Sequence, residues 1–141
     1  MKHLLFVVLF GIVLFGCSNS QTGEKTDILS GAWQITNISG GFAGINDDYE
    51  PSTIVWSFNA TTSQVLVTNN NTQDGILYDG LSSGSYPYSL LINEGKQFLE
   101  IDGQEFAGIN RTNVALVLDQ NQTTSGSGAD GFVLRFISLE N

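Results

Sequence analysis

Apolar residues alternate with polar ones through much of the chain after residue 27. The clearest example lies near the C-terminus, where Phe132, Leu134 and Phe136 occupy every second position. Successive side chains of a β-strand point to opposite faces, so this two-residue period predicts a strand with one face in a core. No window of helical length shows a sustained apolar period of 3.6 residues. The pattern therefore predicts an all-β chain.

Eight strand segments can be delimited between clusters of Gly, Asn, Asp and Ser. They are residues 32–38, 53–58, 64–68, 75–78 taken together with 85–92, 98–101, 105–109, 114–118 and 132–137. Asp102-Gly103 is a strong signal for a tight hairpin between two of them. An even number of strands with short loops closes most simply as an eight-stranded antiparallel up-and-down barrel, which leaves no unpaired edge. A two-sheet sandwich satisfies the same pattern.

The first 16 residues read as a secretory leader rather than as part of the fold. A basic start, Met1-Lys2-His3, precedes an apolar block of 13 residues at 4–16. This block is shorter than the roughly 20 residues that a membrane-spanning helix needs. We therefore divide the chain into a signal peptide (1–16), a lipidated cysteine with a flexible tether (17–27) and one domain (28–141).

Cys17, the only cysteine, follows directly on this leader. The segment Leu14-Phe15-Gly16-Cys17 resembles the lipobox of bacterial lipoproteins, in which the cysteine is acylated and the leader is removed before it. An ordinary secretory signal that contains a cysteine is the alternative. The resemblance implies a lipid anchor in a membrane of the cell envelope. Ser18, where an aspartate would retain a lipoprotein at the inner membrane, implies the outer membrane.

Composition excludes several kinds of catalytic site. His3 is the only histidine and leaves with the leader, and acylation consumes Cys17. The exported part then lacks the side chains for Ser-His-Asp triads, Cys-His dyads and the common zinc sites. The sequence pattern identifies no two carboxylates as the acid and the base or nucleophile that glycoside cleavage needs. We predict no catalytic residue and no cofactor, and an enzyme is the least favoured class.

The chain is strongly acidic, with 14 Asp and Glu against five Lys and Arg and a formal charge of −9. Removal of Lys2 with the leader leaves four cationic side chains. Such a surface repels nucleic acid and anionic lipids, so we expect no nucleic-acid partner and a membrane contact made by acyl chains alone. The acidic segment Asn46-Asp47-Asp48 with Glu50 lacks the spacing of a calcium loop, and we predict no metal site.

Two short motifs resemble those of lipocalins. Gly31-Ala32-Trp33 resembles the G-x-W motif, whose tryptophan plugs the closed end of an eight-stranded barrel. Arg135, in the sequence "DGFVLRF", resembles the arginine of the last strand that packs over that ring. The resemblance implies that Trp33 lies at the closed end under Arg135, and that the first and last strands are neighbours.

The order of further motifs is similar to that in the short lipocalin-like domains of Gram-negative lipoproteins. These motifs are Trp56-Ser57-Phe58, then Gly84, Tyr86 and Tyr88, and finally the closing "DGF" and arginine. The resemblance covers residues 28–141 and implies a barrel with a small-ligand site as one possible role.

Four aromatic residues are the candidate ligand site: Trp56, Phe58, Tyr86 and Tyr88. Either they line a cavity for a small apolar ligand, or they fill a packed barrel whose role is structural or lies in protein contacts in the envelope. If a ligand binds, the acidic charge of the chain favours an apolar or weakly polar molecule that is uncharged or cationic.

Overall fold

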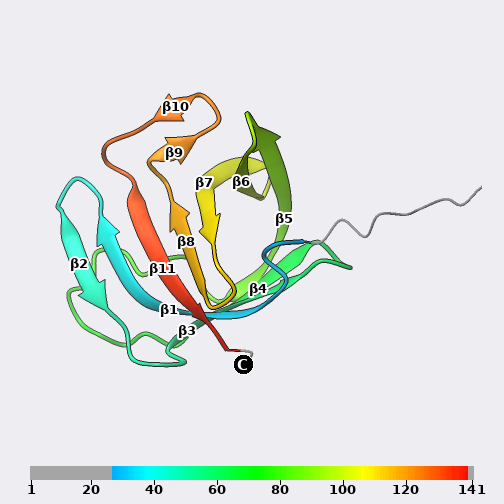
Figure 1. Ribbon diagram of the computed structural model, residues 1–141. Helices are drawn as coiled ribbons and strands as arrows, with labels where there is room; N and C mark the ends of the chain where they lie inside the picture. The colour runs from blue at the N-terminus through cyan, green and yellow to red at the C-terminus, as the bar shows by residue number, and fades with distance from the viewer. Residues whose placement is uncertain (1–26, 140–141) are drawn as a thin grey trace, which may run out of the picture.

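The computed structural model describes residues 27–139, which form an antiparallel β-barrel and contain no helix (Figure 1). The leader, Cys17 and the tether up to residue 26 lie outside the described residues. The strands are β1 (Gly31–Gly40), β2 (Ile45–Asp48), β3 (Ile54–Asn59), β4 (Gln64–Asn69), β5 (Gly84–Asn93), β6 (Lys96–Ile101), β7 (Gln104–Arg111), β8 (Ala115–Asp119), β9 (Gln122–Thr123), β10 (Gly126–Ser127) and β11 (Phe132–Ser138). Between residues 27 and 139 we find no helix capable of spanning a membrane.

The predicted eight-stranded up-and-down barrel is confirmed. Strands β1, β3, β4, β5, β6, β7, β8 and β11 pair in sequence order, and β11 pairs back onto β1 to close the ring. Figure 1 shows β1 and β11 side by side, as the resemblance implied for the first and last strands. The second half of β1 also pairs with β2, while its first half pairs with β3. The short strand β2, which alternation did not reveal, is therefore an addition to the ring.

Two tight turns set the register on one side of the barrel. Asp102 and Gly103, between β6 and β7, have φ angles of 52° and 73°, and Glu94 and Gly95, between β5 and β6, have φ angles of 50° and 76°. Positive φ at both central residues is the geometry of the type I′ hairpin turn, whose twist matches that of the strands it joins. The predicted Asp102-Gly103 hairpin is thus confirmed.

One predicted segment is not a strand. Residues 75–78 belong to the loop between β4 and β5, and only the second half of the joint segment forms a strand. Tyr78 in this loop stacks on Phe132 with a centroid distance of 4.1 Å. A Cβ built on Gly80 would lie 3.6 Å from atoms of both Ile35 and Trp56. Tyr78 and Leu81 of this loop therefore cover one end of the barrel, where they pack on the core from outside any strand.

The segment before β1 covers the other end. Leu29 is fully buried, and its carbonyl accepts a hydrogen bond of 2.8 Å from Trp33 Nε1. The Tyr88 hydroxyl donates to the carboxylate of Asp27. Because β4 runs from this end towards the loop that follows it, the two covering segments lie at opposite ends of the barrel.

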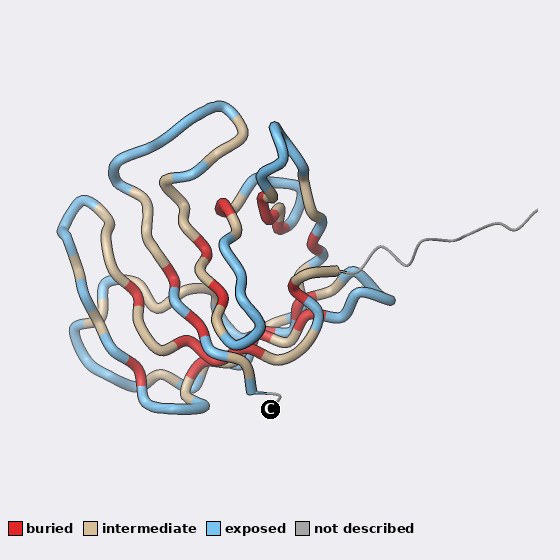
Figure 2. Tube along the Cα trace, in the orientation of Figure 1, coloured by how far each residue is buried: buried red, intermediate tan, exposed pale blue. Residues whose placement is uncertain are grey.

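Aromatic rings fill the interior between these two covers. The ring of Trp56 lies 5.4 Å from that of Phe136, 5.7 Å from that of Phe106 and 6.2 Å from that of Phe58. Phe58 in turn meets Tyr88 edge to face at 5.1 Å. Figure 2 shows exposed residues in the hairpins that project from the barrel and buried residues along the strands that enclose the core.

Candidate functional site

The cation over Trp33 comes from a different strand than the resemblance implied. The guanidinium carbon of Arg111, at the end of β7, lies 5.1 Å from the centroid of the Trp33 ring. Trp33 itself is 1% exposed and lies at the barrel end covered by residues 27–30, as expected. The prediction that Arg135 packs over Trp33 is therefore wrong.

Strand geometry explains why Arg135 cannot reach the ring. Its neighbours Leu134 and Phe136 are buried, so Arg135 points to the outer face of β11 and is exposed. There its Nη1 donates to Asn37 Oδ1 at 2.9 Å and to Ser39 Oγ at 2.8 Å. The contact between the first and last strands exists, but on the outer face of the barrel.

Arg111 points inward because of its place in the register. It stands opposite Leu116, and Ile109 stands opposite Leu118. Both leucines are fully buried, and directly opposed residues of an antiparallel pair share a face. Ile109 and Arg111 therefore follow Ala107 on the inner face of β7. A bulge at Phe106 sets this alternation, because Leu99 pairs with Ala107 while the next residue of β6 pairs with Glu105.

The four predicted ligand-binding aromatics lie together but leave little room for a ligand. Trp56, Phe58 and Tyr88 are 0%, 4% and 7% exposed and contact other rings of the core. Tyr86 is half-buried, and its hydroxyl donates to the carbonyl of Ser82 at 2.9 Å. Only Tyr88 borders one of the three pockets described for residues 27–139, a hollow of about 250 Å³ beside Asp27. The arrangement favours the packed-core alternative.

One atom of this aromatic cluster is exceptional. The indole nitrogen of Trp56 is the only buried side-chain nitrogen or oxygen within residues 27–139 that has no hydrogen-bond partner there. A buried donor without an acceptor costs roughly 1–3 kcal/mol. Trp33 differs in this respect, because its indole nitrogen donates a hydrogen bond to the carbonyl of Leu29.

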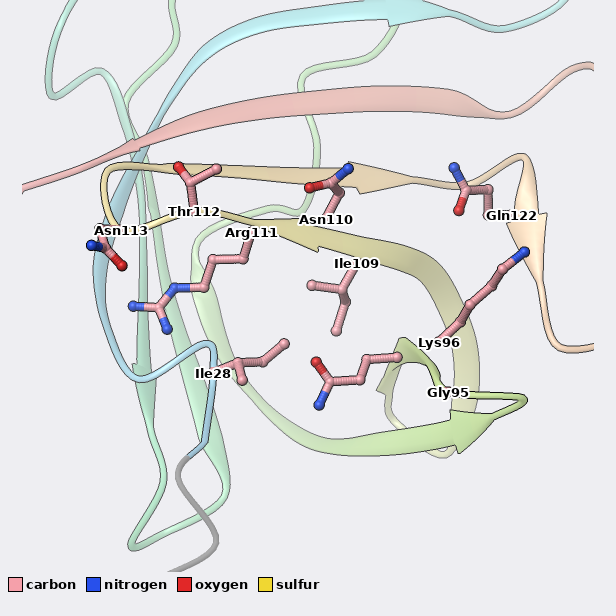
Figure 3. Close-up of a pocket in the computed structure, with 10 residues that line it drawn as sticks. Ile28, Gly95, Lys96, Ile109, Asn110, Arg111, Thr112, Asn113 and Gln122 are labelled. Atoms are coloured by element: carbon pink, nitrogen blue, oxygen red, sulfur yellow. The ribbon is translucent and has the colours of Figure 1, made fainter.

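The largest of the three pockets, about 510 Å³, lies between β7, the β5–β6 turn and the segment before β1 (Figure 3). Ile109 and Arg111 reach into it from β7, and Ile28 faces them from the N-terminal segment. The other lining residues are Gly95, Lys96, Gln97, Asn110, Thr112, Asn113 and Gln122. The sequence did not predict this pocket as a binding site. Ala107, Ile109 and Arg111 occupy alternate positions, but the bulge at Phe106 decides that these positions face inward.

The hairpin of β9 and β10 borders the same region from outside. A Cβ on Gly108 would lie 2.6 Å from Cβ of Gln122, so glycine is what permits this close approach. Thr124 joins the hairpin to the barrel, because its hydroxyl donates to Glu105 at 2.8 Å and its carbonyl accepts from Asn93 at 2.9 Å. The hairpin and Phe98, which is 3% exposed, line a further pocket of about 350 Å³.

Three tyrosines are held in their neutral form. Burial, and then the charges of Asp47 and Asp79, raise the pKa of Tyr49 to about 12. Burial, and then the hydrogen bond to Asp27, raise the pKa of Tyr88. Burial also raises the pKa of Tyr78, against a lowering by the hydrogen bond from Gln120. None of the three is prepared to act as a base near neutral pH.

The acidic segment after β1 serves the fold. The amide nitrogen of Asn37 donates to Asn46 Oδ1 at 3.0 Å and to Asp48 Oδ1 at 2.9 Å, which holds β2 against β1. Residues 27–139 contain no group of three or more acidic, histidine or cysteine side chains placed to hold a metal ion.

Searches against protein-family models, curated proteins and solved structures found no match to this chain. The class that the geometry defines is a closed, eight-stranded antiparallel barrel with a filled core and a cation-bearing pocket at one end.

Proposed function

We propose that this chain is an outer-membrane lipoprotein, cleaved before Cys17 and acylated there, with a lipocalin-like barrel carried on the tether of residues 17–27. In this proposal the barrel is a packed domain that acts in the cell envelope through its ends and outer surface. Nucleic acid is not a partner, because the chain carries a charge of −9.

The observation that carries the packed-domain assignment is the filled interior. Trp56 is fully buried among three other rings, and segments of the chain cover both ends of the barrel. An internal apolar site would need an open volume of several hundred cubic ångströms, about 300 Å³ or more. The three described pockets lie elsewhere than around Trp56 and Phe58.

Two observations support the lipocalin-like assignment. The barrel has eight strands in up-and-down order, and a tryptophan at the start of the first strand lies under a cation at a covered end. That cation belongs to β7, which is a departure from the motif.

A barrel that encloses a small apolar ligand is the second candidate, and one observation favours it. The buried Trp56 indole N–H has no acceptor among residues 27–139, and a ligand with a carbonyl or hydroxyl oxygen would supply one. In this candidate Trp56, Phe58, Tyr86 and Tyr88 contact the ligand after the loop of residues 70–83 moves aside.

Two experiments test these proposals separately. Intact-mass analysis of the protein extracted from membranes should show Cys17 at the N-terminus with its acyl chains, and an unmodified cysteine would refute the anchor. Titration of tryptophan fluorescence with neutral isoprenoids and aromatic ketones should give no response. A saturable response that Trp56→Phe abolishes and Trp33→Phe preserves would establish the enclosed-ligand candidate instead.

A further inference from the structure

The cationic side chains of the barrel are few, and they have unequal surroundings. Residues 27–139 contain three, namely Lys96, Arg111 and Arg135. Arg135 is committed to two hydrogen bonds on the outer face. The side chains of Lys96 and Arg111 make neither a hydrogen bond nor an ion pair with any residue in this range, although the chain carries 14 carboxylates.

Both of these unpaired cations line the same pocket. Of the residues 27–139 that line it, none is acidic, and most of the others are amides or hydroxyls that can donate hydrogen bonds. Figure 3 places Arg111 and Lys96 towards opposite ends of the pocket. In a chain of this composition, a pocket of about 510 Å³ that is lined, within residues 27–139, by two cations and by no carboxylate is a local positive region, with Asp119, which accepts a hydrogen bond from Gln122, and Glu94 among the acidic residues next to its lining.

The guanidinium of Arg111 is exposed, and its one contact within residues 27–139 is with a ring that is itself fixed. Its carbon lies 5.1 Å from the centroid of Trp33, and the hydrogen bond from Trp33 Nε1 to Leu29 fixes that ring. A guanidinium that packs on a ring keeps its N–H groups free at its edge, where they match the two oxygens of a carboxylate or phosphate. Little side-chain entropy is then lost on binding.

Apolar contact is available beside this group. Ile28 and Ile109 face each other across the pocket, next to Arg111 (Figure 3). They suit a short aliphatic portion of a ligand, whereas the amides suit polar substituents. The volume lies within the range of about 300–1,000 Å³ that is typical of small-molecule sites.

We propose that this pocket binds a small organic anion, whose carboxylate or phosphate group is held by Arg111 and whose aliphatic part contacts Ile28 and Ile109. Lys96, at the opposite end, attracts the anion and contacts a second acidic or polar group. The net charge of the chain favours an uncharged or cationic ligand, but the local charge around the pocket favours an anion. The inference goes beyond the proposed function and is independent of the lipid anchor.

The test uses the full chain, purified in a neutral detergent, with butyrate, butyl phosphate, inorganic phosphate and butanol as probes. Binding is measured by tryptophan fluorescence, to which Trp33 under Arg111 contributes, and by isothermal titration calorimetry. We expect saturable binding of butyrate or butyl phosphate, and no binding of butanol. Inorganic phosphate should bind more weakly than butyl phosphate, because it lacks the aliphatic contact.

Matched variants separate local contact from net charge. Arg111→Gln should weaken binding at least about tenfold. Arg135→Gln removes the same charge elsewhere on the barrel and should leave affinity within about twofold. Arg111→Lys keeps the charge without the planar fork and should fall between Arg111→Gln and the unmodified protein. Lys96→Gln leaves the ring contact intact and should weaken binding less than Arg111→Gln.

Three results would overturn the proposal. One is no saturable binding of either organic anion by the unmodified protein. Another is equal weakening by Arg111→Gln and Arg135→Gln, which would show a nonspecific charge effect. Inorganic phosphate that binds as tightly as butyl phosphate would refute the organic ligand. If Arg111→Gln fails to fold, as circular dichroism would show, Arg111→Lys and Lys96→Gln must each weaken binding more than Arg135→Gln for the proposal to stand.

Discussion

Trp33→Phe should destabilise the barrel more than Trp56→Phe, although the two indoles are equally buried. Trp33 is 1% exposed and Trp56 is 0% exposed. Both substitutions remove the same atoms from the core, so the lost apolar burial and the space left behind cost a similar amount, about 1–3 kcal/mol. The two variants therefore differ mainly in what happens to the indole N–H.

The hydrogen bonds of the two indoles give the size of that difference. Trp33 Nε1 donates to the buried carbonyl of Leu29 at 2.8 Å, and phenylalanine leaves this acceptor unpaired at a cost of about 1–3 kcal/mol. Trp56 Nε1 has no acceptor among residues 27–139, so phenylalanine removes a donor that already costs about as much. The free energy of unfolding of Trp33→Phe should be lower than that of Trp56→Phe by at least about 2 kcal/mol.

Urea unfolding followed by far-UV circular dichroism measures this difference. Circular dichroism is needed because each variant keeps a single tryptophan, so fluorescence would not report the same site in both. An unchanged slope with denaturant allows the midpoints to be compared directly. A Trp56→Phe variant that is equally or less stable than Trp33→Phe would refute the assignment of the unpaired donor.

Three further predictions follow from other contacts. Arg111→Ala should shift the tryptophan emission and cost about 0.5–1 kcal/mol of unfolding free energy, whereas Arg135→Ala should leave the emission unchanged. The contribution of Tyr49 to the free energy of unfolding should be fully present below pH 10, where this tyrosine is neutral in the folded and unfolded states. It should fall as the pH rises from 10 to about 12, because the folded state keeps the Tyr49 proton; Tyr49→Phe should show a shallower loss in urea unfolding across that range. Gly108→Val should displace the β9–β10 hairpin, because its Cβ would lie 2.6 Å from a side-chain carbon there, and hydrogen exchange of residues 122–127 should accelerate.

The ring of strands was predictable because β3, β4, β8 and β11 show two-residue alternation and the turn at Asp102-Gly103 has its own residue signature. β3 and β11 have a buried residue at every second position, as Trp56 and Phe136 illustrate. Two-residue alternation gives a wrong prediction where apolar residues cover the core from a loop. Residues 75–78 include Tyr78, which packs over the barrel end from a loop, and a two-residue period cannot distinguish such a covering segment from a strand.

The prediction for Arg135 failed although the sequence contained the information against it. If Leu134 and Phe136 face the core, Arg135 between them must face outward, and Trp33 faces inward. The motif resemblance and this alternation conflict at Arg135, and the structure follows the alternation. The position of Arg111 was harder to predict, because the bulge at Phe106 shifts the inner face of β7 by one residue, and a bulge has no clear sequence signal.

The length of β7 explains why a binding site in this barrel lies at an end rather than in the centre. β7 continues past Phe106 to Arg111, and its inward residues Ile109 and Arg111 stand opposite the buried Leu118 and Leu116 at the edge of the core. On their open side these two positions face the N-terminal segment and solvent, so they accept a partly exposed isoleucine and an exposed cation at no large desolvation cost. Ile28 then closes the space from the side where the chain enters the fold. A small barrel that fills its own interior can in this way still present a preformed recess. Its chemistry is set by the few residues at the edge of the core, and not by the net charge of the chain.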